Sequence, residues 1–274
     1  MAFSNPGFSQ SPAFSQNGGR QSGQQGSPVG YDGMTAEQLQ QLYTQPSAGP
    51  DQTDRMTYED TITKTAIAFA VVVVGAAIGW FVPALAFVGA IAGFVLALVN
   101  IFKKKPSPGL VLAYSAAQGL FVGGISSIFE RDYAGITTQA LLGTGSVFIV
   151  TLLLFRSGKV RESAKATKIF LIAMVGYTVF SLLNLVLSLT GVVSTPWGLR
   201  GFEIAGIPVG FFLGILVVIM AAYSLVLDFT QVQTGVRRGA PRIYGWSAAF
   251  GIVMTVVWLY VEILRMIAIL RGND

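Results

Sequence analysis

The sequence predicts an all-α integral membrane protein with seven transmembrane helices, and three observations support this fold class. Hydrophobic residues make up 53% of the 274-residue chain and charged residues only 11%, whereas a soluble domain carries about a quarter charged residues. Apolar stretches, each close to the ~20 residues that cross a bilayer, recur from residue 62 onward. The loops between them alternate between many and few basic residues, as the positive-inside rule requires of a multi-pass protein.

The apolar stretches place the seven spans in order. We expect them at 62–82, 84–102, 109–129, 136–155, 169–190, 206–227 and 248–270. Thr57 and Asp60 have the spacing of a helix cap and mark the start of the first helix. Only Pro83 separates the first two spans, so these should form a tight hairpin. Helix six should continue about two turns beyond its apolar stretch, to the exit at 235–238.

Residues 1–56 differ in composition from the rest of the chain. They are rich in Gly, Ser, Gln and Pro (SNPGFSQSPAFSQNGGRQSGQQGSPVG) and lack apolar periodicity. Such a segment cannot bury enough apolar surface to offset its ordering entropy, which predicts a disordered cytoplasmic tail. One short helix is predicted in MTAEQLQQLY, where Thr35 and Gln38 have capping-box spacing. Residues 57–274 should form the membrane domain.

The basic residues orient this domain in the membrane. The loops after the second, fourth and sixth spans are basic, and with the N-terminal segment they place 14 of the 18 lysines and arginines on one side. The other side has only four: Arg131, Arg200, Arg265 and Arg271. The positive-inside rule therefore predicts a cytoplasmic N-terminus and an external C-terminus.

The composition also excludes several kinds of site. The chain has no cysteine and no histidine, which excludes disulfides, a thiolate nucleophile, a Cys/His zinc site and histidine ligation of haem. We expect no enzymatic activity and no cofactor. The basic residues flank apolar segments, so they indicate topology and not nucleic-acid binding. A switch near neutral pH would have to use carboxylates with raised pKa values.

Small residues recur at four-residue spacing on four predicted helices. Such spacing allows close helix packing in lipid, and packing is preferred here to a role in lining a substrate path. The pairs and triplet are Gly75/Gly79, Gly89/Gly93, Gly119/Gly123 and Gly206/Gly210/Gly214.

Polar residues also recur at helical spacing within two spans. Helix three carries Gln118 beside Tyr114 and Ser115. Helix five carries a longer stripe of Tyr177, Ser181, Asn184 and Ser188. Both groups could hydrogen-bond across helices or line a wet cavity, and sequence alone leaves the two alternatives open.

Two acids lie within predicted helices, and they are the strongest functional signal. Asp228, in SLVLDFTQ, lies in the extension of helix six, and Glu262 is well inside helix seven. Each ionised carboxylate there costs at least ~2.5 kcal/mol on insertion scales, so each needs a partner or a proton. Glu262 could pair with Arg265, three residues later on the same face, unless that arginine extends to the headgroups. Alternatively, Glu262 could meet Asp228 and share one proton with it, which would make a pH sensor.

Several segments together resemble one family. They are MTYEDTITKT, YSAAQGLFVGGISSIFE, YAGITTQALLGT, LDFTQVQTGVRRGAP and AAFGIVMTVVWLYVEILRMIAIL, which fall between about residues 57 and 271. On these segments the chain resembles the Bax inhibitor-1 family, also called the transmembrane Bax-inhibitor-motif or YccA-like family, and in particular its actinobacterial branch. The last two segments are specific when they occur together.

The resemblance implies a seven-helix fold with helix seven central, in the bacterial cell membrane. It also implies a pH-sensitive leak of calcium or other cations, in which acids on helices six and seven share a proton when closed. By this resemblance Asp228 occupies the helix-six position and Glu262 the helix-seven position. Many relatives have Asp at the helix-seven position. Lys103 is the nearest match to a basic residue that pairs with the helix-six acid in relatives. Gln118 stands where actinobacterial relatives often have Glu.

Two functions from different classes follow. The first is a cation leak gated by Asp228 and Glu262, which would also be transient calcium ligands because calcium prefers hard oxygen donors. The second is a non-conducting regulator that binds a membrane-anchored protease or another membrane protein, with the N-terminal tail as the contact segment. The lipid bilayer is a partner in both cases.

Overall fold

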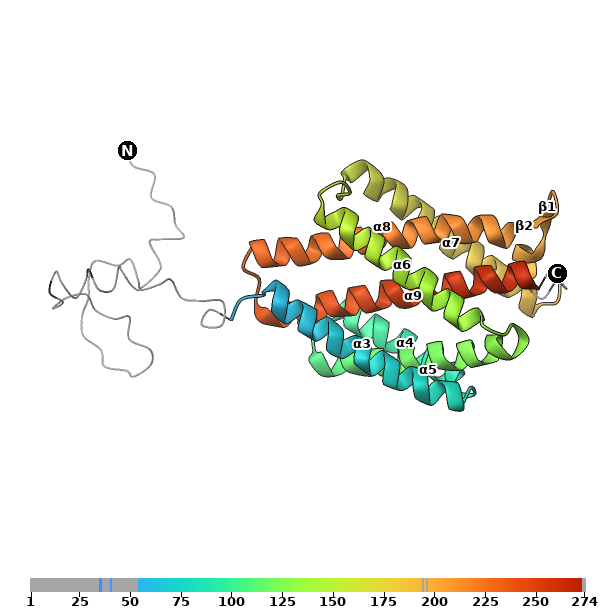
Figure 1. Cartoon of the computed structure of the whole chain (residues 1–274), viewed down its shortest axis with the longest axis horizontal. Helices are drawn as coiled ribbons and strands as arrows, with labels where there is room; N and C mark the ends of the chain where they lie inside the picture. The colour runs from blue at the N-terminus through green and yellow to red at the C-terminus, as the bar shows by residue number, and fades with distance from the viewer. Residues whose placement is uncertain (1–34, 36–39, 41–53, 194, 196, 273–274) are drawn as a thin grey trace, which may run out of the picture. The chain divides into compact units, whose positions relative to one another are not determined.

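The computed structural model of the protein describes Thr35, Gln40, residues 54–193, Thr195 and residues 197–272 (Figure 1). In this part of the chain, seven helices are long and apolar enough to cross a membrane, in agreement with the predicted number. They are α3 (Tyr58–Phe81), α4 (Leu85–Phe102), α5 (Pro108–Asp132), α6 (Ile136–Arg156), α7 (Ala164–Leu189), α8 (Val209–Arg237) and α9 (Gly245–Arg271). The short helix predicted in MTAEQLQQLY lies outside the described residues, apart from Thr35 and Gln40.

The ends of several helices follow the sequence signals. The Thr57 hydroxyl caps α3 by accepting a hydrogen bond from the backbone N–H of Asp60 at 3.1 Å, as predicted. Helix α8 runs to Arg237, so Asp228 lies within a continuous helix. A short 3₁₀ turn, η2 (Arg242–Tyr244), precedes α9.

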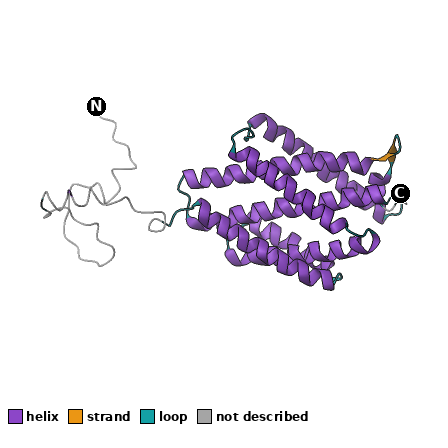
Figure 2. Ribbon diagram, in the orientation of Figure 1, coloured by secondary structure: helices purple, strands orange, loops and turns teal. Residues whose placement is uncertain are grey.

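The segment between α7 and α8 is more structured than expected. It contains a 3₁₀ turn, η1 (Gly198–Gly201), and a hairpin of two short antiparallel strands, β1 (Glu203–Ile204) and β2 (Ile207–Pro208) (Figure 2). Ala205 and Gly206 form the turn of this hairpin, both with positive φ, as a tight two-residue hairpin turn requires. The prediction that Gly206 begins helix six was therefore wrong, and the helix starts three residues later.

Helix α9 is the most buried of the spans. It packs against α3, α5, α6 and α8, while α4 packs chiefly against α5. Apolar side chains such as Leu259, Leu264 and Ile269 fill these contacts and are almost fully buried. By contrast, no residue of α7 is buried, and this helix packs mainly against η1 and α8.

Glycines allow α3, α4 and α5 to approach closely. A Cβ atom added to Gly119 in α5 would lie 2.9 Å from Cα of Gly75 in α3. One added to Gly89 in α4 would lie 2.6 Å from the carbonyl oxygen of Ala117 in α5. Neither position could accept a larger side chain without moving a backbone, which confirms the packing interpretation of these small residues.

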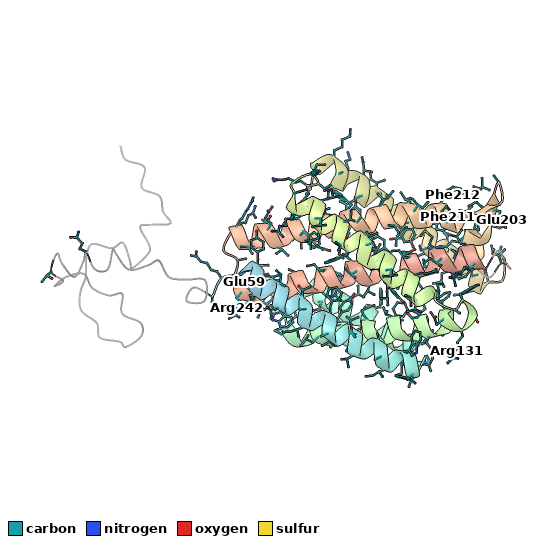
Figure 3. All side chains as sticks on the ribbon, in the orientation of Figure 1. Glu59, Arg131, Glu203, Phe211, Phe212 and Arg242 are labelled. Carbon is teal, nitrogen blue, oxygen red and sulfur yellow. The ribbon has the colours of Figure 1, made fainter. Side chains whose placement is uncertain are left out.

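Charged side chains gather at the two ends of the helices. Figure 3 shows Glu59 and Arg242 near the start of α3, and Arg131 and Glu203 at the opposite end. At the first of these ends, Arg242 Nε lies 2.8 Å from Asp60 Oδ1 and joins η2 to α3. Between the two ends, the helices carry few ionisable groups, and the acids Asp228 and Glu262 are among them.

Candidate functional site

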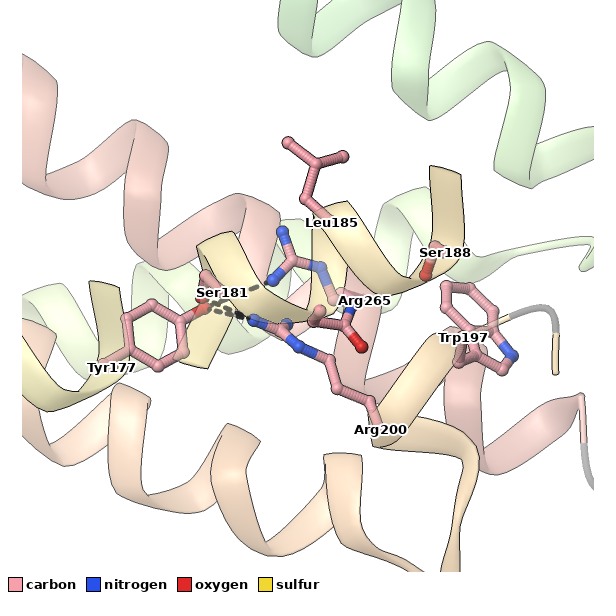
Figure 4. A pocket seen from close by; sticks show the side chains of 8 residues that line it. Tyr177, Ser181, Leu185, Ser188, Trp197, Arg200 and Arg265 are labelled. Carbon is pink, nitrogen blue, oxygen red and sulfur yellow. Dashed lines mark hydrogen bonds between the residues drawn. The ribbon is translucent and has the colours of Figure 1, made fainter. Parts of the chain in front are cut away.

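The polar stripe of α7 faces a cavity of about 500 Å³ (Figure 4). Because Tyr177, Ser181, Asn184 and Ser188 are spaced by three or four residues, they lie on one side of the helix. Leu185 of α7 also lines the cavity, and the wall is completed by Trp197 and Arg200 of the segment between α7 and α8 and by Arg265 of α9. We call this space the arginine cavity.

Glu262 is buried beside the arginine cavity, with an exposed fraction of 4%. Its Oε1 atom accepts a hydrogen bond from the Tyr177 hydroxyl and another from Arg265 Nη1 at 2.9 Å. Its Oε2 atom lies 3.8 Å from Arg200 Nη1, within ion-pair distance. Two guanidinium groups and one hydroxyl therefore interact with the carboxylate. These interactions offset the free-energy cost of burying its charge in a membrane.

Arg200 is a member of this cluster that sequence reasoning missed, because it was assigned to a loop and used only to count charges. Its side chain extends from η1 and is buried, with an exposed fraction of 6%. Its Nη2 atom donates to the Tyr177 hydroxyl and to Ser181 Oγ, both at 3.0 Å. The backbone N–H of Leu199 donates to Asn184 Oδ1 at 2.6 Å and fixes η1 against α7. The signal was present: Arg200 is the only charged residue between 191 and 202.

Asp228 has a different environment. The hydroxyl of Thr255 in α9 donates a hydrogen bond of 2.7 Å to Asp228 Oδ2, and this hydroxyl also lies 3.2 Å from Ser224 Oγ. The Oδ1 atom lies over Gly251, where an added Cβ would be only 3.0 Å away. Among the described residues, no lysine or arginine forms an ion pair with Asp228.

The structure places the two acids at different heights along α9. Asp228 contacts this helix at Thr255, seven residues before Glu262, which corresponds to about 10.5 Å along the axis. Trp258 lies between these positions on the same face of the helix. The hydrogen bonds of the described residues do not join the two carboxylates, so of the two alternatives for Glu262 the direct contact with Asp228 is not formed in this conformation. Glu262 has instead the alternative partner, Arg265.

A second cavity, of about 370 Å³, lies between α7, α8 and α9. Its wall includes Thr255, which bonds to Asp228, Ser224, which lies next to the Thr255 hydroxyl, and Trp258. Tyr177 and Ser181 line both this cavity and the arginine cavity. The cluster around Glu262 therefore lies where the two cavities meet.

Two other predicted residues lie away from these cavities. Lys103 is exposed at the end of α4 and lines a small cavity of about 70 Å³ with Tyr244 and Phe250. The amide of Gln118 in α5 faces α4, 2.7 Å from the Cβ position of Gly93. The structure thus brings Tyr177, Ser181, Asn184, Glu262 and Arg265 together and leaves these two outside.

The described residues contain no group of three or more acids that could hold a metal ion. A calcium ion at Asp228 or Glu262 would therefore need further oxygen ligands from water or from the backbone, because calcium takes six to eight.

No curated protein matches the chain. The sequence model of the family described as Bax inhibitor 1 like matches residues 5–272, a range that includes all seven spans and both membrane acids. The chain therefore belongs to the Bax inhibitor 1 like family.

Proposed function

We propose that this protein is a pH-sensitive leak for calcium or other cations in the bacterial cell membrane, with its N-terminus in the cytoplasm and its C-terminus outside. The observation that supports this function best is the pair of adjoining cavities between α7 and α9. Neither acid lines a cavity itself, but each contacts residues that do: Glu262 bonds to Tyr177, where the two cavities meet, and Asp228 bonds to Thr255 in the wall of the second cavity. Membership of the Bax inhibitor 1 like family supports the same conclusion.

In this proposal Asp228 is the pH sensor. Within the described part of the chain, its side chain hydrogen-bonds only to the neutral hydroxyl of Thr255 and has no counter-charge within ion-pair distance. Protonation of Asp228 removes the negative charge beside the second cavity, which then no longer attracts cations. Deprotonation provides a hard anionic oxygen that favours the entry of water and calcium. The leak should therefore increase as the pH rises.

Glu262 then acts as a latch and not as a second sensor. Its bonds to Tyr177, Arg200 and Arg265 join α7, η1 and α9 at the junction of the two cavities. Two guanidinium groups at this junction also repel a cation that would pass while the cluster is intact. A proton shared directly between Glu262 and Asp228 would require α8 and α9 to shift by about two turns relative to one another. Separate roles for the two acids avoid this requirement.

Calcium flux from proteoliposomes tests the two roles. Asp228→Asn should lower the flux at alkaline pH and abolish its rise with pH. Glu262→Gln should instead raise the flux at acidic pH, because the latch loses its ion pairs. We expect changes of at least about tenfold, since a unit-charge interaction at 4 Å is worth ~4 kcal/mol at an effective dielectric constant of 20. Glu162→Gln, in the exposed loop between α6 and α7, is the matched control.

The outcomes separate the alternatives. Unchanged flux and pH dependence in both variants would refute this mechanism. A wild-type flux no greater than that of protein-free liposomes at every pH would favour the non-conducting regulator. Capture of a membrane protease that is lost when residues 1–56 are deleted would then support the regulator directly.

A further inference from the structure

We infer that the arginine cavity binds a phosphate-type oxyanion, either the phosphate of a lipid headgroup or free phosphate. Conduction of cations does not require an anion-binding site, so this inference is independent of the proposed function. It rests on the charge of the cavity, on the donors that remain unused there, and on its size.

The cavity carries an excess of positive charge. Arg200 and Arg265 both line it, and an arginine side chain stays protonated in proteins. Glu262 is the only acid that forms an ion pair with either of them among the described residues. Two guanidinium groups against one carboxylate leave one positive charge without a partner among the described residues. Arg200 is buried, whereas the side chain of Arg265 is 30% exposed.

Part of the hydrogen-bonding capacity of Arg200 is unused. Its Nε atom is buried and has no hydrogen-bond partner in the described part of the chain. Its Nη1 atom lies 3.8 Å from Glu262 Oε2, which is too long for a hydrogen bond. A buried donor without a partner costs about 1–3 kcal/mol, and an oxyanion could remove this cost. Guanidinium groups bind phosphate through charge-assisted N–H···O bonds. Nε and Nη1 lie on different edges of the guanidinium group, so each could donate one such bond to an oxyanion.

The other lining residues suit the same ligand. Ser181 and Ser188 provide hydroxyl groups that can donate to phosphate oxygens, and both face the cavity. The volume of about 500 Å³ is within the usual range for small-molecule sites. Glu262 offsets one of the two positive charges, and its Oε1 atom accepts hydrogen bonds from Tyr177 and Arg265.

The position of the cavity allows either source of phosphate. It extends along α7 from Tyr177, at the middle of the helix, to the exposed residue Ser188 near its end. Trp197 lies at the same end of the cavity, and tryptophan favours the headgroup region of a bilayer. A lipid phosphate could enter from the side at this level, and free phosphate could enter from the aqueous side.

Two binding measurements on the full chain distinguish the sources. Titration of the detergent-solubilised protein with inorganic phosphate, followed by calorimetry, measures free phosphate. Native mass spectrometry after exchange into mixed micelles of phosphatidylcholine and phosphatidic acid measures lipid retention. Binding in either experiment should weaken at least tenfold in Arg200→Gln and Arg265→Gln. Arg131→Gln, which removes an exposed arginine at the same end of the bundle, should bind like the wild type.

A further variant keeps both arginines in place. Ser188 is exposed, so Ser188→Phe should fold normally while its ring narrows the cavity. It should reduce binding by a similar factor without a change in melting temperature. Absence of binding to both probes would overturn the inference, as would equal weakening by Arg131→Gln, which would indicate non-specific attraction to surface charge.

Discussion

The hydroxyl of Tyr177 in α7 donates a hydrogen bond to the buried carboxylate of Glu262 in α9, and the two residues are 85 positions apart in the sequence. The same hydroxyl accepts hydrogen bonds from Arg200 Nη2 at 3.0 Å and from Arg265 Nη1 at 3.2 Å. One phenolic group therefore connects both arginines to the acid. This connection is the basis of the first two predictions.

Replacement of Tyr177 by phenylalanine should weaken the cluster and keep the ring contacts, including the one with Trp258. Loss of a hydrogen bond to a charged group costs about 1.5–3 kcal/mol. We expect a melting temperature several degrees lower in detergent, together with a higher calcium leak at acidic pH. Tyr244→Phe, at an exposed position in η2, is the control. If the variant has the melting temperature and the calcium leak of the wild type, the Tyr177 hydroxyl does not hold the cluster together.

Substitution of the two arginines should be strongly non-additive. Arg200→Gln and Arg265→Gln each leave Glu262 with one guanidinium group. The double variant leaves a buried carboxylate with no cation, and removal of the last partner from a buried pair costs about 3–5 kcal/mol. Thermal or denaturant unfolding of the four proteins in a mutant cycle measures the difference. Simple addition of the single effects would mean that the two arginines act on Glu262 independently.

The position of Asp228 should depend on the absence of a side chain at Gly251. An added Cβ would lie 3.0 Å from Asp228 Oδ1, so Gly251→Ala must displace the carboxylate by a few tenths of an ångström. We expect a smaller pH-dependent leak and a stability loss of about 1–3 kcal/mol from overpacking. Gly145→Ala in α6 meets no atom within 4 Å and should be neutral or slightly stabilising. Equal behaviour of the two alanine variants would contradict the packing of Asp228 on α9.

The proposed orientation can be tested with single cysteines, because the chain has none of its own. Ile204→Cys, in the exposed strand β1, should react with a membrane-impermeant maleimide in intact cells. Ser157→Cys, exposed after α6, should react only after the membrane is opened. The reverse labelling pattern would show that the protein has the opposite orientation in the membrane.

The spans could be predicted from sequence because hydropathy over some 20 residues depends on composition and not on neighbours. The seven predicted stretches correspond to the seven helices, and the Thr57 cap is confirmed. Asp228 and Glu262 do not contact each other in the structure. Sequence could not decide this, because the offset of α8 along the axis of α9 depends on how the two helices pack. Sequence places both acids near the same helix pair but does not give this offset.

Arg200 shows a second limit of sequence analysis. Its role depends on a 3₁₀ turn that folds against α7 through the bond between Leu199 and Asn184. Hydropathy treats such a connection as an external loop. The polar stripe of α7 could be found from its spacing, but the residue that meets it lies outside any span.

Helix α7 has no buried residue, and polar bonds provide much of its attachment to the rest of the protein. Thr167 near its start bonds to the Tyr223 hydroxyl of α8 at 2.8 Å, and Tyr177 bonds to Glu262 farther along. Water can replace a protein partner in such a hydrogen bond, but it cannot replace the contacts between packed apolar side chains. Amide protons of α7 should therefore exchange with deuterium sooner than those of α9, and the surrounding lipid should influence the angle of α7 more than that of any deeply packed span.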